Sequence, residues 1–330
     1  MRFKWFFRLF PPPVFLYMPY AGLEISDDAI RCLAYKGLDR VRRKVASYGS
    51  EDLPVGLISG GDIKDDKAMI GRLADFGRKH SLSYVKVSVP EEKAYLFQTE
   101  VPDMGIKAVA QNIEFKLEEN VPLSAADAVF YFILLPKTPG ITTRTAMVSV
   151  VPKSYIDKYS SLIESAGMKP IAFELAPRSL ARAVVPRGSL NAKVLVHAMD
   201  RKTGIYVVSE GAVRFTSTVT GAASDGQAAS IESLGKEISR VYSYWLSHGG
   251  GRPVDEIILA GRGAAAFDGI GRYIADAERI PVVKADIWAN ALDREEGIPP
   301  ISMEDSLAYA VASGLAIDPS LEPDAAAANK

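Results

Sequence analysis

The segment Gly22-Leu23-Glu24-Ile25-Ser26-Asp27-Asp28-Ala29-Ile30-Arg31 has the pattern of a strand, a tight turn and a second strand. A similar segment, Val196-His197-Ala198-Met199-Asp200-Arg201-Lys202-Thr203, follows about 170 residues later. Each segment opens a stretch in which strands and amphipathic helices alternate, which is typical of α/β proteins. The sequence therefore predicts an α/β fold with two lobes that begin in the same way.

Length and composition agree with a two-lobed globular protein. The 330 residues are 48% hydrophobic and 24% charged, which is enough for two cores. A formal charge of −1, with both signs intermixed, excludes a broad basic surface for nucleic acid. The single cysteine, Cys32, and the scattered His80, His197 and His248 predict neither disulfides nor a metal site. No apolar run reaches the roughly 18 residues of a membrane span.

A compact block within the first lobe has its own order of elements. Apolar residues at helical spacing predict an amphipathic helix there, and continuous apolar runs predict buried strands. The expected elements are an extended segment over 94–101, a helix over 104–120 and strands over 129–135 and 145–151. We expect the next helix to begin at Ser154, because Asp157 three residues later gives a pattern like a capping box.

Actin-like ATPases hold the phosphates of a nucleotide between two strand-turn-strand segments of this kind. The turns present backbone N–H groups to the phosphates, and Asp side chains orient Mg²⁺ and water. A later glycine-rich turn, here Leu259-Ala260-Gly261-Arg262-Gly263-Ala264, lets the backbone approach the nucleoside. By this comparison ATP and Mg²⁺ are the candidate cofactors. The candidate contacts are Ser26, Asp27, Thr203, Gly261 and Gly263.

An ordered set of segments resembles the PilM family. The opening Gly22–Arg31 is similar to the family's first strand, turn and strand. Further segments that resemble its signatures are Val89–Phe97 with Val101-Pro102, Glu118–Leu123, Ala166–Pro170, Glu237–Arg240 with Tyr244, and Ser313–Ala316. The similarity extends in order over residues 20 to 318.

The resemblance implies an actin-like (ribonuclease H-like) two-lobed fold with an inserted SHS2-type strand-helix-strand-strand subdomain. It also implies a cytoplasmic protein, peripheral at the inner face of the cell membrane, that works with a PilN-like membrane protein and other type IV pilus assembly proteins. Glu237 and Arg240 would lie at the nucleotide. Within this similarity we expect a first lobe over 21–190, with the subdomain at about 88–152, and a second lobe over 191–318 whose last helix returns to the first. Composition adds an aromatic and basic arm over 1–20 and a frayed tail over 319–330.

Several positions depart from the family pattern. The first Asp is Glu24, the catalytic candidate, and the turn Gly is Ser26. In the second turn the family's Asp and Gly are His197 and Met199, and His197 offers no fixed negative charge to Mg²⁺. The middle Gly of the third turn is Arg262. These departures predict a degenerate phosphate site with weak or absent ATP hydrolysis.

Structural roles compete with functional ones at these positions. Glu24 and Asp27 fit ordinary strand-end and turn residues, and His197 fits a core or cleft histidine. Arg262 fits either a solvated loop charge or a cation in the place of a phosphate. Glu237 and Arg240 could pair with neighbours along one helix face.

The N-terminal arm has its own two interpretations. Phe3, Phe6, Phe7 and Phe10 would share one face of a helix, opposite Lys4 and Arg8. Such a face suits peripheral contact with a membrane surface, or packing onto the protein itself or a neighbour.

The leading hypothesis for function is a scaffold that binds the tail of a PilN-like protein. We expect the tail in a groove where the inserted block meets the main sheet, near Val89, Tyr95, Phe97 and Phe115, although each could be a core residue. An active actin-like ATPase is the first alternative. An FtsA-like cell-division anchor is the second, against which stands a tail over 318–330 with almost no large apolar residues.

Overall fold

The computed structural model describes residues 18–37, 43–137, 140–220, 228–249, 252–262, 264–292 and 299–317, with the side chains of 228–230 and 264–267 left aside. The arm phenylalanines Phe3, Phe6, Phe7 and Phe10, the tail 319–330 and Gly263 lie outside the described residues. Among the helices of the described ranges, none is both long and apolar enough to cross a bilayer.

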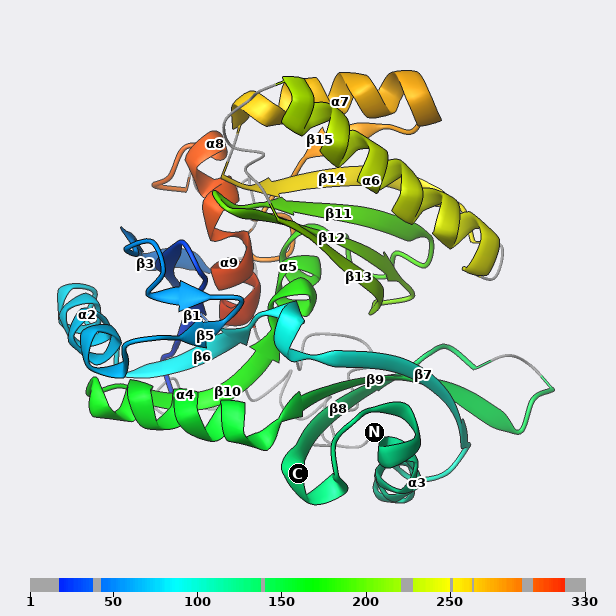
Figure 1. The fold of residues 1–330 in the computed structure, drawn as a ribbon, viewed down its shortest axis with the longest axis horizontal. Coiled ribbons are helices and arrows are strands. Elements are labelled where there is room, and N and C mark those ends of the chain that lie inside the picture. Colours follow the sequence, from blue (N-terminus) through cyan, green and yellow to red (C-terminus); the bar gives the residue numbers. More distant parts are fainter. Residues whose placement is uncertain are drawn as a thin grey trace.

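The first lobe is a five-stranded sheet with helices on both faces (Figure 1). The strand order is β10-β6-β1-β2-β3; β1, β2 and β3 pair antiparallel, and β6 and β10 continue the sheet in parallel. Helices α2 and α4 pack against one face around Leu23, Phe76 and Tyr159. The bounds are β1 Ala21–Ile25, β2 Ala29–Lys36, β3 Lys44–Asp52, β6 Tyr84–Val89, β10 Lys169–Leu175, α2 Asp66–Lys79 and α4 Lys153–Ser165, with a small hairpin of β4 Ile58–Ser59 and β5 Asp62–Ile63.

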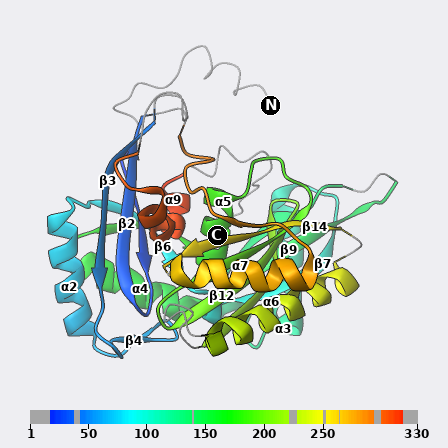
Figure 2. The ribbon, with the colours of Figure 1, turned by 90° about the horizontal axis from the view of Figure 1, so that it is seen from above.

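The second lobe repeats this plan in the order β13-β12-β11-β14-β15. Strand β11 is buried along its whole length, because α6 and α7 cover the outer face and α5 covers the inner one. Figure 2 shows α6 and α7 side by side on the outer face. The bounds are β11 Ala192–Ala198, β12 Lys202–Ser209, β13 Ala212–Thr220, β14 Val254–Gly261, β15 Val282–Lys284, α5 Ala176–Val184, α6 Ala228–His248 and α7 Ala264–Glu278.

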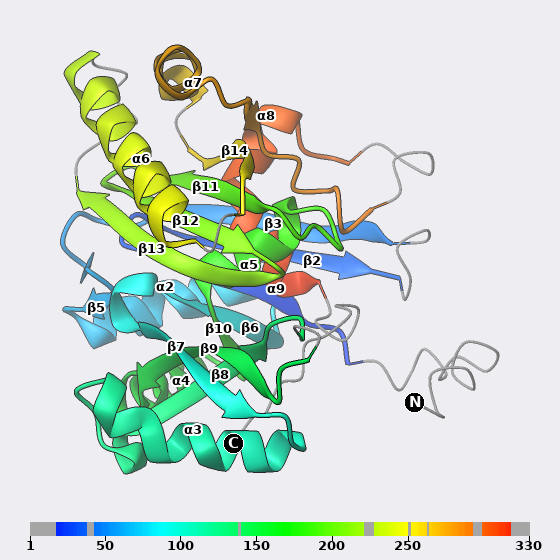
Figure 3. The same cartoon turned by 90° about the vertical axis from the view of Figure 1, so that its right-hand side faces the viewer.

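A strand-helix-strand-strand subdomain is inserted into the first lobe, as the sequence predicted (Figure 3). Its antiparallel sheet has the order β7-β9-β8, and α3 packs on it through Val109, Ile113 and Leu117 around Phe132. The 3₁₀ turn η2 leads into it. The bounds are η2 Glu91–Lys93, β7 Tyr95–Pro102, α3 Ile106–Asn120, η3 Ala125–Asp127, β8 Ala128–Leu134 and β9 Thr143–Pro152.

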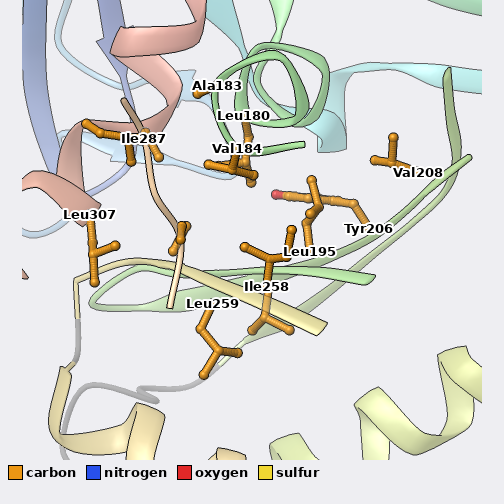
Figure 4. Close-up of a cluster of buried hydrophobic side chains, with 14 of the residues drawn as sticks. Leu180, Ala183, Val184, Leu195, Tyr206, Val208, Ile258, Leu259, Ile287 and Leu307 are labelled. Carbon is orange, nitrogen blue, oxygen red and sulfur yellow. The ribbon is translucent and has the colours of Figure 1, made fainter. Parts of the chain in front are cut away.

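Two helices fill the space between the lobes. The apolar side of α5, with Leu180 and Val184, packs against Leu195 and Tyr206 of the second sheet (Figure 4). Helix α9, Ala310–Ala316, contacts α5 on one side and β1, β2 and β6 on the other. The segment from Met303 to Ala316, the last helical part of the described chain, forms three pieces: α8 Met303–Ser306, the 3₁₀ turn η4 Leu307–Tyr309, and α9.

Candidate functional site

The β1–β2 turn is held by contacts within the first lobe. The hydroxyl of Ser26 accepts hydrogen bonds from the backbone N–H groups of Asp28 and Ala29, at 3.4 and 3.1 Å. The carboxylate of Asp27 accepts from the N–H groups of Gly60 and Gly61, at 2.8 and 3.0 Å. The side chains of both predicted nucleotide contacts therefore serve the architecture of their own lobe.

The two turns that open the lobes touch each other directly. The guanidinium of Arg201 lies 3.1 Å from Asp28 through Nε, and it donates to the carbonyl of Asp27 at 3.1 Å through Nη1. The backbone N–H of Arg201 also donates to the Asp28 carboxylate at 3.3 Å. The protein itself thus bridges the space between the two turns.

Arg262 forms a second bridge between the lobes. Its Nη1 lies 2.7 Å from Asp52 at the end of β3 and 3.2 Å from Asp200 in the β11–β12 turn. The side chain is therefore paired with carboxylates rather than free in solvent. Because Arg262 and both carboxylates are partly exposed, we expect these ion pairs to fix the relative orientation of the turns more than to add to the free energy of unfolding.

Gly261 is required by the approach of one strand to another. Its φ of 98° suits glycine, and a Cβ there would lie 2.0 Å from the carbonyl oxygen of Ala198. That same carbonyl accepts from the N–H of Arg262 at 2.8 Å. This close approach accounts for the glycine without a nucleotide.

Glu24 is buried beneath the first turn and is 2% exposed. It pairs across β1 and β2 with Arg31, whose Nη1 lies 3.8 Å from Oε2. Burial raises the pKa of Glu24, and the charge of Arg31 opposes that rise. The catalytic candidate thus faces a guanidinium of its own chain.

His197 lies on β11 and is also 2% exposed. Burial lowers the pKa of His197 to about 3, and the positive charges of Arg31 and Lys202 add to the effect. Thr203 and Met199 beside it are buried as well. At neutral pH the imidazole of His197, just before the second turn, is therefore neutral. No cluster of three or more potential metal-ligating side chains occurs in the described part of the chain.

The neutral state of His197 predicts a dependence of stability on pH. Between pH 6.5 and about 3 the unfolded chain binds a proton at this residue and the folded chain does not, so stability falls as the pH falls. From pH 7 to pH 5, the native chain should lose on the order of 2 kcal/mol more than His197→Gln. Urea unfolding at both pH values measures this; equal losses would contradict a neutral buried His197. His80, whose pKa burial also lowers, is common to both proteins.

Glu237 and Arg240 contact each other on α6. Arg240 Nη2 lies 2.6 Å from Glu237 Oε1, which also accepts from Ser217 of β13 at 3.1 Å. The contact with Arg240 is the one expected along one helix face, and the contact with Ser217 joins the helix to β13.

The four predicted peptide contacts occupy different environments. Val89 is buried in the first-lobe core, and Phe97 packs against the subdomain core. Tyr95 is 40% exposed at the start of β7, and Phe115 is 85% exposed on α3. Two of the four thus belong to or pack on cores, and the other two are exposed on β7 and α3.

A pocket of about 360 Å³ lies where the subdomain meets α5 and the second lobe; we call it the junction pocket. Apolar walls come from the end of β8, from α5 and the connection after it, and from β12 and β13. The described lining residues include none of the four predicted peptide contacts. They are Ile133, Leu134, Pro136, Lys137, Arg144, Arg178, Ala181, Arg182, Val185, Pro186, Arg187, Gly188, Ser189, Leu190, Val208, Glu210, Gly211, Val213 and Asn290.

A buried ion cluster holds α5 at this pocket. Glu174 accepts from Arg182 at 2.6 Å and from Ser179 at 2.9 Å, and Arg178 lies 2.6 Å away. Burial by itself would raise the pKa of Glu174, but the guanidiniums of Arg182 and Arg178 outweigh it and lower the pKa to about 2. The Asn290 amide donates to the carbonyls of Arg182, Ala183 and Val185 and so caps the end of α5.

The sequence interpretation missed this cluster and the Asp28–Arg201 bridge. A signal for the cluster exists, since Glu174, Arg178 and Arg182 follow one another at spacings of four. Asp28 and Arg201 stand within the two quoted turns, but no local pattern pairs them.

Comparison with known proteins rests on structure. No protein family model matches the sequence, and no curated protein does. A solved PilM-PilN type IV pilus biogenesis complex superposes with a TM-score of 0.75 and 16% identity, over 91% of this chain and 98% of that chain.

Two further solved structures are less similar. The cytoplasmic domain of EpsL, an inner-membrane component of the Vibrio cholerae type II secretion system, has a TM-score of 0.47 and 12% identity, over 89% of this chain and 94% of that one. The ethanolamine utilization protein EutJ from Carboxydothermus hydrogenoformans has a TM-score of 0.47 and 13% identity, over 93% and 90%. The superposition on the PilM-PilN complex, together with the strand order, shows that the chain has the actin-like, two-lobed α/β fold with an inserted strand-helix-strand-strand subdomain that its resemblance to the PilM family predicted.

Proposed function

We propose that the chain is a scaffold of a type IV pilus assembly complex, which holds the cytoplasmic tail of a PilN-like membrane protein in the junction pocket. The observation that carries the proposal is this pocket of about 360 Å³. It lies in a fold that superposes, over 91% of the chain, on a solved PilM-PilN type IV pilus biogenesis complex. The chain would work at the inner face of the cell membrane and would meet other assembly proteins there.

The position of the junction pocket supports this role. Its walls come from the subdomain, from α5 and from the second lobe, so one extended segment could contact all three. Crevices between domains commonly bind ligands, and an extended peptide combines side-chain pockets with backbone hydrogen bonds. An occupied pocket would fix the relative position of the three parts.

The contacts between the lobes support a cleft that does not turn over ATP. Arg201 and Arg262 join the lobes where phosphates would lie, Glu24 faces Arg31, and His197 is neutral. Magnesium binding needs oxygen ligands with negative charge, and this arrangement does not fit a magnesium–nucleotide site. The cleft would serve as a rigid joint between the lobes.

Calorimetric titration with the N-terminal cytoplasmic tail of a PilN-like protein tests the proposed scaffold role. Leu190 lines the pocket and is 54% exposed, and Leu246 on α6 is 51% exposed, which makes them a matched pair. Leu190→Ser should weaken binding about tenfold, because an apolar contact is lost, and Leu246→Ser should not. Absence of binding by the folded chain, or equal effects of both substitutions, would remove the proposal.

ATP hydrolysis by the purified chain should be absent or far below about 1 per second, with or without Mg²⁺. A phosphate-release assay checks this. Turnover at ordinary enzyme rates that Glu24→Ala abolishes would instead establish an active ATPase.

A further inference from the structure

The junction pocket is rich in positive charge. Five cationic side chains line it, and among the lining residues that the structure describes Glu210 is the one carboxylate. The cations are Lys137, Arg144, Arg178, Arg182 and Arg187. They come from the β8–β9 hairpin on one side and from α5 and its connection on the other, so they face the pocket from two walls.

Among the described residues, carboxylates near the pocket are fewer than these cations. Lys137 pairs with Asp103 at 2.5 Å, and the other four cations lie near two further carboxylates, Glu210 and Glu174. Glu210 is itself engaged by Arg214 at 3.2 Å and by Arg252, both of which add positive charge beside the pocket. Glu174 is one carboxylate shared by Arg178 and Arg182. Arg144 donates to the carbonyl of Leu135 at 2.9 Å, a neutral partner that satisfies a donor but not the charge.

We infer that the segment held in the junction pocket is acidic. Its apolar residues would fill the walls of the pocket, and aspartate or glutamate residues among them would meet the cations. The inference rests on the proposed function and names the chemistry of its partner. A basic segment would bring like charges together in a half-enclosed space, which costs free energy. A carboxylate there forms charge-assisted hydrogen bonds to guanidinium groups, which are stronger than those between neutral groups.

A displayed library of random peptides, selected on the full chain, tests the inference. We expect enrichment of Asp and Glu near apolar residues. The enriched peptide, made synthetically and measured by fluorescence anisotropy, should bind about tenfold more tightly than its Asn and Gln counterpart. Its affinity should fall as salt is added.

Charge reversal on the protein provides the matched control. Arg187 is exposed at the pocket, and Arg272 is exposed on α7 at the outer face of the second lobe. Arg187→Glu should weaken binding of the acidic peptide about tenfold or more, and Arg272→Glu should leave the affinity of the chain for this peptide unchanged. Enrichment of neutral or basic peptides whose binding Leu190→Ser weakens would overturn the inference and leave the scaffold proposal intact. Failure to select any peptide dependent on Leu190 would overturn both.

The chain's own residues 318–330, which include Asp318, Glu322 and Asp324, are a competing occupant of the same chemistry. The full chain with Asp318→Asn, Glu322→Gln and Asp324→Asn distinguishes a partner segment from the chain's own residues 318–330 as the occupant of the pocket. We expect the peptide affinity to be unchanged. A rise of about tenfold or more would assign the pocket to this segment and overturn the assignment to a partner.

Discussion

Replacing Glu174 by leucine is expected to lower the free energy of unfolding by about 3–5 kcal/mol, because two guanidinium groups lose their shared carboxylate. Arg182 is nearly fully buried, and it also donates to the carbonyl of Gly314 at 2.9 Å. An uncompensated charge at this depth is costly, since water cannot reach it. Equilibrium unfolding in urea gives the change directly.

The double variant Glu174→Leu with Arg182→Met is the control for this prediction. It removes the charges of Glu174 and Arg182, leaves the more exposed Arg178, and nearly keeps the side-chain volume, so much of the lost stability should return. A loss of less than about 1 kcal/mol in the free energy of unfolding for Glu174→Leu alone would show that water reaches the cluster and screens its charges.

Replacing Gly314 by alanine should destabilise the chain by about 3 kcal/mol or more, although alanine is the better helix former. A Cβ at Gly314 would lie 1.7 Å from the carbonyl oxygen of Ser179 in α5. The obstacle is backbone and cannot rotate away, so α9 and α5 would have to separate. These two helices connect the cores of both lobes, and the effect should therefore appear in global unfolding.

Gly71→Ala in α2 provides the matched control. Nothing lies within 4 Å of a Cβ at that position. Helix propensity then acts alone and should stabilise the chain by about 0.5–1 kcal/mol. Thermal unfolding of the two variants should thus move in opposite directions, and a neutral or stabilising Gly314→Ala would contradict the close contact of α5 and α9.

Local patterns predicted the order of elements well and their ends less well. The helix expected over 104–120 spans Ile106–Asn120, because its apolar residues recur at the helical period. The expected capping box at Ser154 was wrong: α4 begins at Lys153, its N-cap is Pro152 without a side-chain hydrogen bond, and Asp157 pairs with Lys153 at 2.5 Å. Strand β9 runs directly into this helix, so the preceding strand rather than a capping side chain sets its start.

The sequence by itself determined the two strand-turn-strand openings, the inserted subdomain and the identities of Glu24, His197 and Arg262. Tertiary structure alone decided what those residues contact. Asp28 and Arg201 are 173 positions apart, and Asp52 and Arg262 are 210 apart. Hydrophobic periodicity specifies which face of an element is buried, but it carries no information about which distant turn that element meets. The junction pocket likewise combines residues from 133 to 290, so its position and charge exist only once the subdomain, α5 and the second lobe have packed together.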